Sequence, residues 1–233
     1  MLSKGRDVQL SRASLPLDVQ PIVFVVDDDI SMREALESLI ENAGWRPETF
    51  ASGEEFLLHA PMRRASCLLL DYGLPDLNGL QIQQRIAAER PDMSIIFITG
   101  RGDVPITVKA MKAGAVEFLT KPFKSEALIE AIETAIQRSH AALRRAEDVR
   151  AFESCYASLS AREREVMDLV VSGLLNKQVG HALGISEITV KGHRGRMMKK
   201  MKAKTLAKLV TMAADFQCVG YCRSVVEGHG GRL

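Results

Sequence analysis

Short, continuous apolar runs recur through the first half of the chain. The clearest, at residues 22–26, is rich in β-branched residues and lies between Pro21 and three consecutive aspartates. Runs of this kind are typical of strands that are buried on both faces of a parallel sheet. The other runs, of which the first is the weakest, are residues 46–50, 67–70, 94–98 and 117–120.

Segments with a helical period separate these runs. Their apolar positions recur every three or four residues, as on the buried face of an amphipathic helix. Five strands alternating with five helices predict a doubly wound, flavodoxin-like α/β domain with a five-stranded parallel sheet. The helical segments are residues 32–43, 54–59, 80–88, 106–113 and the stretch from residue 125 onward.

The pattern from residue 158 to residue 216 is helical only. Ser160 is a suitable N-cap, and Glu163 three residues later completes a capping box. A tight turn at residues 184–186 separates two further helices and so predicts a helix-turn-helix, whose second helix enters the major groove of DNA. We therefore expect an all-α domain of four helices, which begin near residues 160, 176, 187 and 205.

The domain boundaries follow these changes of pattern. Between the two domains, residues 139–157 carry many charges and one apolar helical face. This face could be a dimer contact, or the segment could be a solvated linker helix. The predicted segments are a flexible N-terminal extension (1–20), the α/β domain (21–138), a helical linker (139–157), the four-helix domain (158–216) and a flexible C-terminal tail (217–233).

The composition narrows the class of protein. Of the 233 residues 46% are hydrophobic and 26% are charged, and no apolar run approaches the ~20 residues of a membrane span. The four cysteines form no CxxC pair, which favours a reduced, cytoplasmic protein. The net charge is only +2, yet residues 186–208 hold eight lysines or arginines against one acidic residue, Glu187. Such a stretch indicates either a negatively charged partner or a solvated surface.

Polar side chains follow the apolar runs at the points where the strands should end. Asp27 and Asp28 follow the first run, Asp71 the third, Thr99 the fourth and Lys121 the fifth. The carboxyl ends of parallel strands share one edge of the sheet, so we expect these groups to converge in one pocket. Carboxylate oxygens suit Mg²⁺. An ionised Asp71 could act as a nucleophile toward phosphorus, with the lysine and the hydroxyl binding the phosphoryl oxygens.

Four motifs in this region resemble the receiver domain of two-component response regulators. They are VVDDD, DYGLPDLNG, ITG and FLTKPF, and the resemblance covers residues 21–138. It implies that Asp71 accepts a phosphoryl group, that Lys121 contacts this group, and that the bond from Lys121 to Pro122 is cis. The other implied roles are the Mg²⁺ ligands (Asp27, Asp28, Asp71 and the carbonyl of Gly73) and a switch pair (Thr99 and Phe118).

The stretch SAREREVMDLVVSGLLNKQVGHALGISEITVKGHRGRMMKKM resembles the output domain of the NarL/FixJ class of response regulators. The resemblance implies binding of operator DNA as a dimer. Gly192 and Gly195 occupy positions that resemble base-reading sites of the family. Either the backbone approaches the groove closely, or base reading shifts to Lys191, Arg194 and Arg196, which is our expectation. The candidate DNA contacts are Lys177, Thr189, Lys191, His193, Arg194 and Arg196.

The sequence therefore predicts a phosphorylation-dependent transcription regulator. It is not expected to be an enzyme beyond its own phosphorylation and dephosphorylation at Asp71. The expected partners are a sensor histidine kinase, double-stranded operator DNA, RNA polymerase and, after phosphorylation, a second copy of the chain, with no membrane. Phosphorylation could enforce dimerisation or relieve inhibition of the output domain. Two other classes stay open: a phosphate-indifferent DNA binder with a docking domain, and a hydrolase that uses the acidic pocket.

Overall fold

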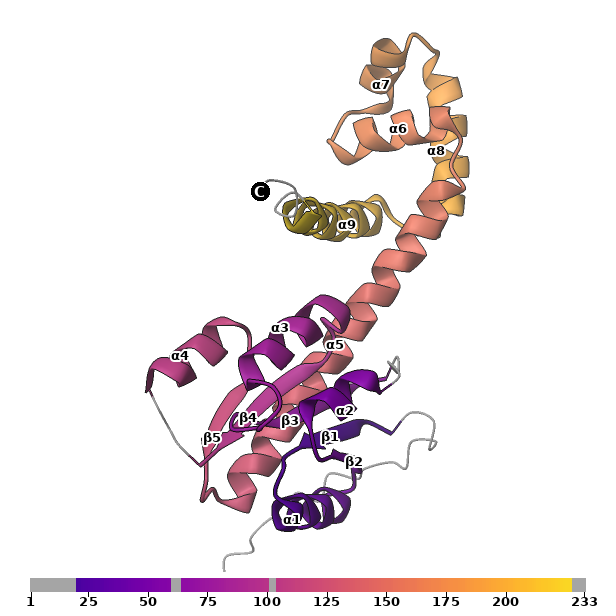
Figure 1. The fold of residues 1–233 in the computed structure, drawn as a ribbon. Helices are drawn as coiled ribbons and strands as arrows, with labels where there is room; N and C mark the ends of the chain where they lie inside the picture. The colour runs from indigo at the N-terminus through magenta and orange to yellow at the C-terminus, as the bar shows by residue number, and fades with distance from the viewer. Residues whose placement is uncertain (1–19, 60–63, 101–103, 228–233) are drawn as a thin grey trace, which may run out of the picture. The chain divides into compact units, whose positions relative to one another are not determined.

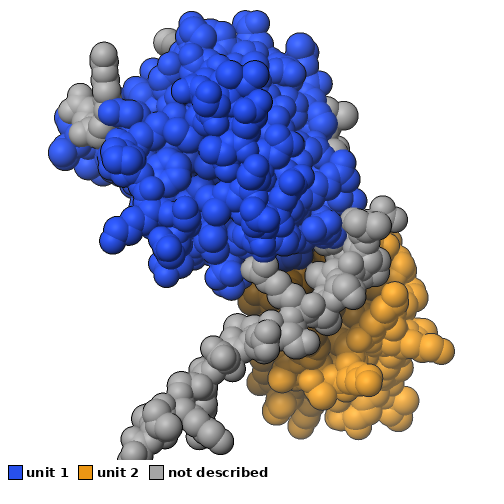
Figure 2. Space-filling view, turned by 90° about the horizontal axis from the view of Figure 1, so that it is seen from below, with its two compact units in different colours: residues 1–143 blue, residues 144–233 orange. Residues whose placement is uncertain are grey.

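The computed structural model describes residues 20–59, 64–100 and 104–227, with side-chain surroundings up to Phe216. The chain forms two compact units, residues 1–143 and residues 144–233 (Figure 2). The predicted N-terminal extension lies almost entirely outside the described residues. Within the part of the chain that is described, no helix is both long enough and apolar enough to cross a membrane.

The first unit is a doubly wound α/β fold (Figure 1). Its five strands form one parallel sheet in the order β2-β1-β3-β4-β5, which confirms the predicted fold class. The strands are β1 (Ile22–Val26), β2 (Arg46–Phe50), β3 (Ser66–Asp71), β4 (Ser94–Thr99) and β5 (Glu117–Thr120). The helices are α1 (Ile30–Asn42), α2 (Gly53–Leu58), α3 (Gly79–Glu89), α4 (Val104–Lys112) and α5 (Ser125–Ala157).

Alternate residues along the central strands enter two separate cores. Phe24 and Leu68, which are neighbours across β1 and β3, pack against α2, α3 and α4. Val25 and Leu69, the next pair along, pack against α1 and α5. Because helices cover both faces, the middle of each central strand is a continuous apolar run, as the sequence pattern predicts. The carboxyl-terminal edge of the sheet is therefore left to carry polar groups.

The second unit consists of helices that pack around the end of α5. Ser160 and Glu163 form the predicted capping box, and Gly184 takes the left-handed conformation in the turn between the two helices of the helix-turn-helix. Val190 and Met197 are buried, as their spacing predicts. The helices are α6 (Ala161–Val171), α7 (Asn176–Leu183), α8 (Glu187–Lys200) and α9 (Leu206–Glu227).

The connecting segments are helical in the structure. Residues 139–157, the expected helical linker, are the last part of α5, which runs from Ser125 to Ala157 without a break. Helix α9 continues past residue 217, where the flexible tail was expected to begin, and ends at Glu227. No proline interrupts this stretch, and the single Gly220 costs a helix only about 1 kcal/mol relative to alanine. Residues 228–233 lie outside the described part of the chain.

Candidate functional site

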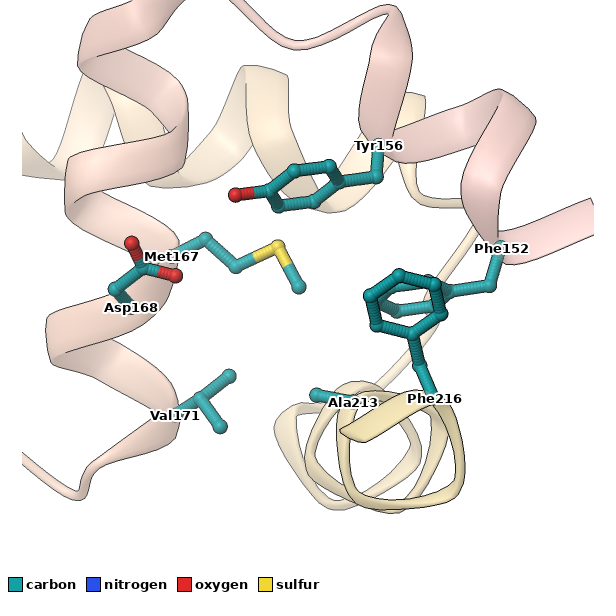
Figure 3. A pocket seen from close by; sticks show the side chains of 7 residues that line it. All are labelled: Phe152, Tyr156, Met167, Asp168, Val171, Ala213 and Phe216. Atoms are coloured by element: carbon teal, nitrogen blue, oxygen red, sulfur yellow. The ribbon is translucent and has the colours of Figure 1, made fainter. Parts of the chain in front are cut away.

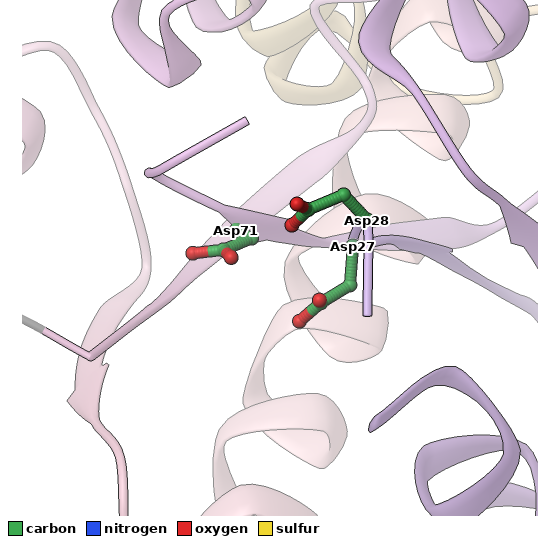
Figure 4. Close-up of side chains that lie close together, drawn as sticks. All are labelled: Asp27, Asp28 and Asp71. Atoms are coloured by element: carbon green, nitrogen blue, oxygen red, sulfur yellow. The ribbon is translucent and has the colours of Figure 1, made fainter. Parts of the chain in front are cut away.

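Three carboxylates meet at the carboxyl-terminal edge of the sheet (Figure 4). Asp27, Asp28 and Asp71 each offer an oxygen, and these oxygens lie within 4.8 Å of one another. The side chains come from the ends of β1 and β3, where Val26 and Leu70 are neighbours in register. The strand order reverses between β1 and β3, which is where open α/β sheets bind their ligands. The convergence predicted from the sequence is therefore present.

Lys121 lies between two of these carboxylates. Its Nζ donates a hydrogen bond to Oδ2 of Asp27 at 2.6 Å and one to Oδ2 of Asp71 at 3.5 Å. Partial burial lowers the pKa of Lys121, but the hydrogen bond to Asp27 and the attraction of both carboxylates outweigh it, so the net pKa is raised. The backbone N–H of Lys121 also donates to the carbonyl of Thr99 at 2.7 Å. The lysine is thus a fixed positive charge.

Backbone groups hold the other oxygens of the two bridged aspartates. Oδ1 of Asp27 accepts from the N–H of Asp29 at 3.0 Å, and Oδ1 of Asp71 accepts from the N–H of Gly73 at 3.2 Å. The side chain of Asp29 is the N-cap of α1, so it accepts hydrogen bonds from the start of that helix. The side chain of Asp27 is 2% exposed, whereas that of Asp71 is 12% exposed. Asp71 is therefore the more accessible of the two held carboxylates.

Thr99 and Phe118 lie close to the same edge. Thr99 is the last residue of β4, is buried, and is in register with Thr120 of β5. Phe118 is half-buried, and its ring centroid lies 6.0 Å from that of Phe97 in the core shared with α3 and α4. The structure thus places Thr99 on β4, the strand next to that of Asp71, and Phe118 on β5, one strand further. Movement of this pair stays a prediction, as does the ligand role of the Gly73 carbonyl.

The donor set of this pocket fits a hard divalent cation. Three carboxylates so close together repel one another, and Lys121 balances one of the three negative charges. All of the converging donors are oxygens, and Mg²⁺ takes oxygen ligands while keeping part of its water shell. Asp28 is exposed and could turn toward such an ion without breaking a hydrogen bond of the strand.

The helix-turn-helix carries the second candidate site. Lys177 on α7, with Thr189, Lys191 and Arg196 on α8, has an exposed side chain. The N–H of Thr189 donates to Oγ of Ser186, the N-cap of α8, at 3.1 Å. That backbone donor is therefore engaged in the cap of α8.

Several of the expected DNA contacts already have protein partners. Arg194 is half-buried, and its Nη1 donates to Oδ1 of Asn176 at 2.9 Å, which ties α8 to α7. Arg196 and His193 lie together on α8, with Nη2 and Nδ1 3.1 Å apart. Lys191 pairs with Glu187 one turn earlier at 2.9 Å, but both side chains are exposed, so a DNA phosphate could displace the carboxylate.

Sequence reasoning missed a buried charge in this unit. Glu163 is 3% exposed and accepts a hydrogen bond from Nζ of Lys200 at 2.6 Å, while Nε of Arg196 lies 3.6 Å away. The bond from Lys200 and the backbone N–H of Ser160 lower the pKa of Glu163 from 4.5 to about 2. The capping-box pattern in the sequence predicts the contact of Glu163 with Ser160 but not the contact with Lys200. The lysine lies 37 positions further along the chain.

The second unit also contains a cavity of about 240 Å³ (Figure 3). Three aromatic rings form part of its wall. The ring of Phe152 stacks on that of Phe216 with centroids 4.7 Å apart, and the ring of Tyr156 stacks on Phe152 at 6.1 Å. The lining residues belong to α5, α6 and α9, and the stacked rings join α9 to the end of α5.

Comparisons with known proteins give a family match in each of the two units. Residues 23–133 match the family described as the response regulator receiver domain, and residues 157–213 match bacterial regulatory proteins of the luxR family. The chain is similar to Nodulation protein W of Bradyrhizobium diazoefficiens, with 47% identity over 82% of this chain and 85% of the relative. It is also similar to the transcriptional regulatory protein FixJ of Rhizobium meliloti, with 41% identity over 82% of this chain and 94% of the relative.

A solved structure of the response regulator StyR extends the likeness to the fold. It has 43% sequence identity and a TM-score of 0.73, and the match covers 84% of this chain and 98% of that one. The two family matches lie on the two units with the acidic pocket and the helix-turn-helix. The chain therefore belongs to the two-component response regulators of the NarL/FixJ class, transcription regulators with a receiver domain and a LuxR-type DNA-binding domain.

Proposed function

We propose that phosphorylation of Asp71 switches the affinity of this regulator for operator DNA. The observation that carries the proposal is the convergence of Asp27, Asp28, Asp71 and Lys121 at one edge of the sheet. A domain that served only for docking would not need this set. The phosphoryl group comes from a sensor histidine kinase, and the phosphorylated protein acts as a dimer.

The proposed transfer uses the accessible carboxylate of Asp71. One of its oxygens attacks the phosphorus of a phosphohistidine; the O–P bond forms while the N–P bond breaks, and the electron pair returns to the imidazole nitrogen. Lys121, whose Nζ lies 3.5 Å from Oδ2 of Asp71, stays close enough to bind an oxygen of the new phosphoryl group. Asp27 keeps the lysine in place during the transfer through the 2.6 Å hydrogen bond.

The residues that would hold Mg²⁺ are Asp27, Asp28, Asp71 and the carbonyl of Gly73. The bound ion would offset the negative charge of the carboxylates and the phosphoryl oxygens. The N–H of Gly73 already orients Oδ1 of Asp71, so the same loop serves the nucleophile and the ion site. Removal of divalent cations with a chelator should therefore abolish phosphorylation and leave the fold unchanged.

Thr99 and Phe118 are proposed to transmit the change. Once the phosphoryl group is present, the Thr99 hydroxyl moves toward it and the Phe118 ring turns inward, which repacks the face made by α4 and α5. Helix α4 exposes three large apolar side chains, and this supports dimerisation through that face. They are Val104, Val108 and Met111.

The DNA contacts are proposed to come from the helix-turn-helix. Lys177 on α7 and Thr189, Lys191 and Arg196 on α8 would contact phosphates or base edges, and His193 and Arg194 would support the contacts made by α8. Two bound domains then recruit RNA polymerase at the operator. The described cysteines, Cys67 and Cys155, are unpaired, which is compatible with a reducing cytoplasm.

Operator binding with and without phosphate tests this function. The wild type and Asp71→Asn are incubated with a small phosphodonor and Mg²⁺, and their affinities for the same operator are compared. The proposal expects the phosphodonor to tighten binding by the wild type and to leave Asp71→Asn unchanged. Equal and phosphate-independent binding by both proteins would show that phosphorylation of Asp71 does not control operator affinity.

A further inference from the structure

One face of α8 is unusually bare. Ile188, Gly192 and Gly195 follow one another at steps of four and three residues, which places them within a wedge of about 60° on the helix surface. This wedge lies opposite Val190 and Met197, the residues that α8 buries. It is therefore the face that α8 turns away from its own domain.

Folding does not require either glycine. A Cβ at Gly195 would meet no atom within 4 Å in the part of the chain that the structure describes, and one at Gly192 would lie 3.8 Å from Nη1 of Arg196. Gly180 in α7 is different, because a Cβ there would lie 2.8 Å from the carbonyl oxygen of Ile185. Glycine within a helix lowers its stability relative to alanine. A requirement outside the domain therefore explains Gly192 and Gly195 better than packing does.

An apolar side chain stands at the head of this face. Ile188 is 81% exposed, although isoleucine side chains are usually buried. Basic residues border the bare face: Lys191 on one side, Arg196 on the other and Lys199 one turn beyond Gly195. A positive rim around an apolar centre fits the DNA major groove, because the rim meets phosphates and the centre meets base edges. The apolar feature of a base edge in that groove is the C5 methyl group of thymine.

We infer that Ile188 is a specificity-determining residue that contacts a thymine methyl group in each operator half-site. The glycines let the backbone of α8 come close enough to the bases for this contact. Arg194, which sequence reasoning expected to read bases, is held by Asn176. The inference rests on the proposed DNA-binding function and names the feature of DNA that this helix recognises.

Replacement of thymine by deoxyuridine in the operator isolates the methyl group. Sites are first selected from random DNA with the full-length, phosphorylated protein, and each thymine of the selected site is then replaced in turn. We expect one position per half-site at which the wild type loses roughly fourfold in affinity, the value for one buried methyl-sized group. Ile188→Ala should bind thymine and deoxyuridine at that position equally well.

A matched control variant and three distinct outcomes distinguish a failure of the inference from a failure of the proposed function. Val210→Ala also shortens an exposed apolar side chain of the same unit and should retain the preference for thymine. If the wild type selects no sequence at all, the proposed function fails. If it selects a site but no deoxyuridine replacement matters, or if Ile188→Ala keeps the preference, the role of Ile188 is overturned.

Substitution of a glycine in α8 gives a second test, in which the stability of the protein should rise while its affinity for the selected site should fall. Gly195→Ala should raise the melting temperature of the protein, since its Cβ enters open space. The same methyl group should hold the backbone away from the bases and weaken binding to the selected site at least fivefold, with little change for unrelated DNA. Unchanged affinity for the selected site would contradict the close approach of α8.

Discussion

The ion pair of Glu163 with Lys200 gives a quantitative prediction about stability. The carboxylate is buried and accepts two hydrogen bonds, one from Nζ of Lys200 at 2.6 Å and one from the N–H of Ser160 at 2.9 Å, while the N–H of Glu163 donates to Oγ of Ser160 at 3.3 Å. Glu163→Gln keeps the shape but removes the charge. Hydrogen bonds to charged groups contribute about 1.5–3 kcal/mol each, so the variant should lose about 2 kcal/mol of unfolding free energy at pH 7.

The same pair predicts how this loss depends on pH. The pKa of Glu163 is about 2 in the folded protein and 4.5 as its ordinary value. A depressed pKa means that the stabilisation is fully present above pH 4.5 and is lost as the pH falls toward 2. The difference between the wild type and Glu163→Gln should therefore be constant from pH 7 to about pH 5 and should shrink toward zero near pH 2.

Urea unfolding followed by amide hydrogen exchange is the suitable assay. Peptides from α6 and α8 report the opening of the second unit separately from the first, so the two-domain chain can be used intact. Lys200→Met serves as the partner variant, and the double variant completes a cycle that isolates the pair. A difference that stays the same from pH 7 to pH 2.5 would show that packing, and not charge, is responsible, and would refute the reasoning.

Three further predictions concern the second unit. Phe152→Ala removes the centre of the aromatic stack and should lower stability by about 3–5 kcal/mol, measurable by calorimetry; a loss below about 1 kcal/mol would contradict the role of the stack. Gly180→Ala should lower the melting temperature because its Cβ would meet the Ile185 carbonyl, and an unchanged value would show that the turn can shift. Operator affinity should fall steeply with salt concentration. Lys177→Ala should reduce the slope of the logarithm of the binding constant against the logarithm of the salt concentration by about one. An unchanged slope would show that Lys177 does not contact a DNA phosphate.

Local sequence patterns were sufficient for the sheet and for the acidic pocket. The β-branched runs mark strands with both faces covered, and parallel strands bring their carboxyl ends to one edge whatever the loops between them do. Asp27 and Asp71 were therefore expected at the same edge, and the strand order, in which β1 and β3 are adjacent, makes them neighbours. Strand order alone gives this adjacency, although it does not give the 2.6 Å bond from Lys121.

The surface of α8 could not be predicted as well. The burial of Val190 follows from helical spacing, but the partners of the basic residues depend on the packing of separate helices. Arg194 looked like a base-reading residue because its partner, Asn176, lies on α7 and 18 positions away. The exposure of Ile188 also emerged only with the helix in place, because an isoleucine near a helix start is usually assigned to the core.

Direct detection of phosphate on Asp71 tests the central claim. The full chain is incubated with Mg²⁺ and a small phosphodonor, and the protein is digested and examined by mass spectrometry for an acyl phosphate. The account predicts one phosphoryl group on the peptide that contains Asp71, lost on treatment with hydroxylamine, dependent on Mg²⁺ and absent from Asp71→Asn. A folded wild-type protein that takes up no phosphoryl group, or takes it up equally in Asp71→Asn, would contradict it.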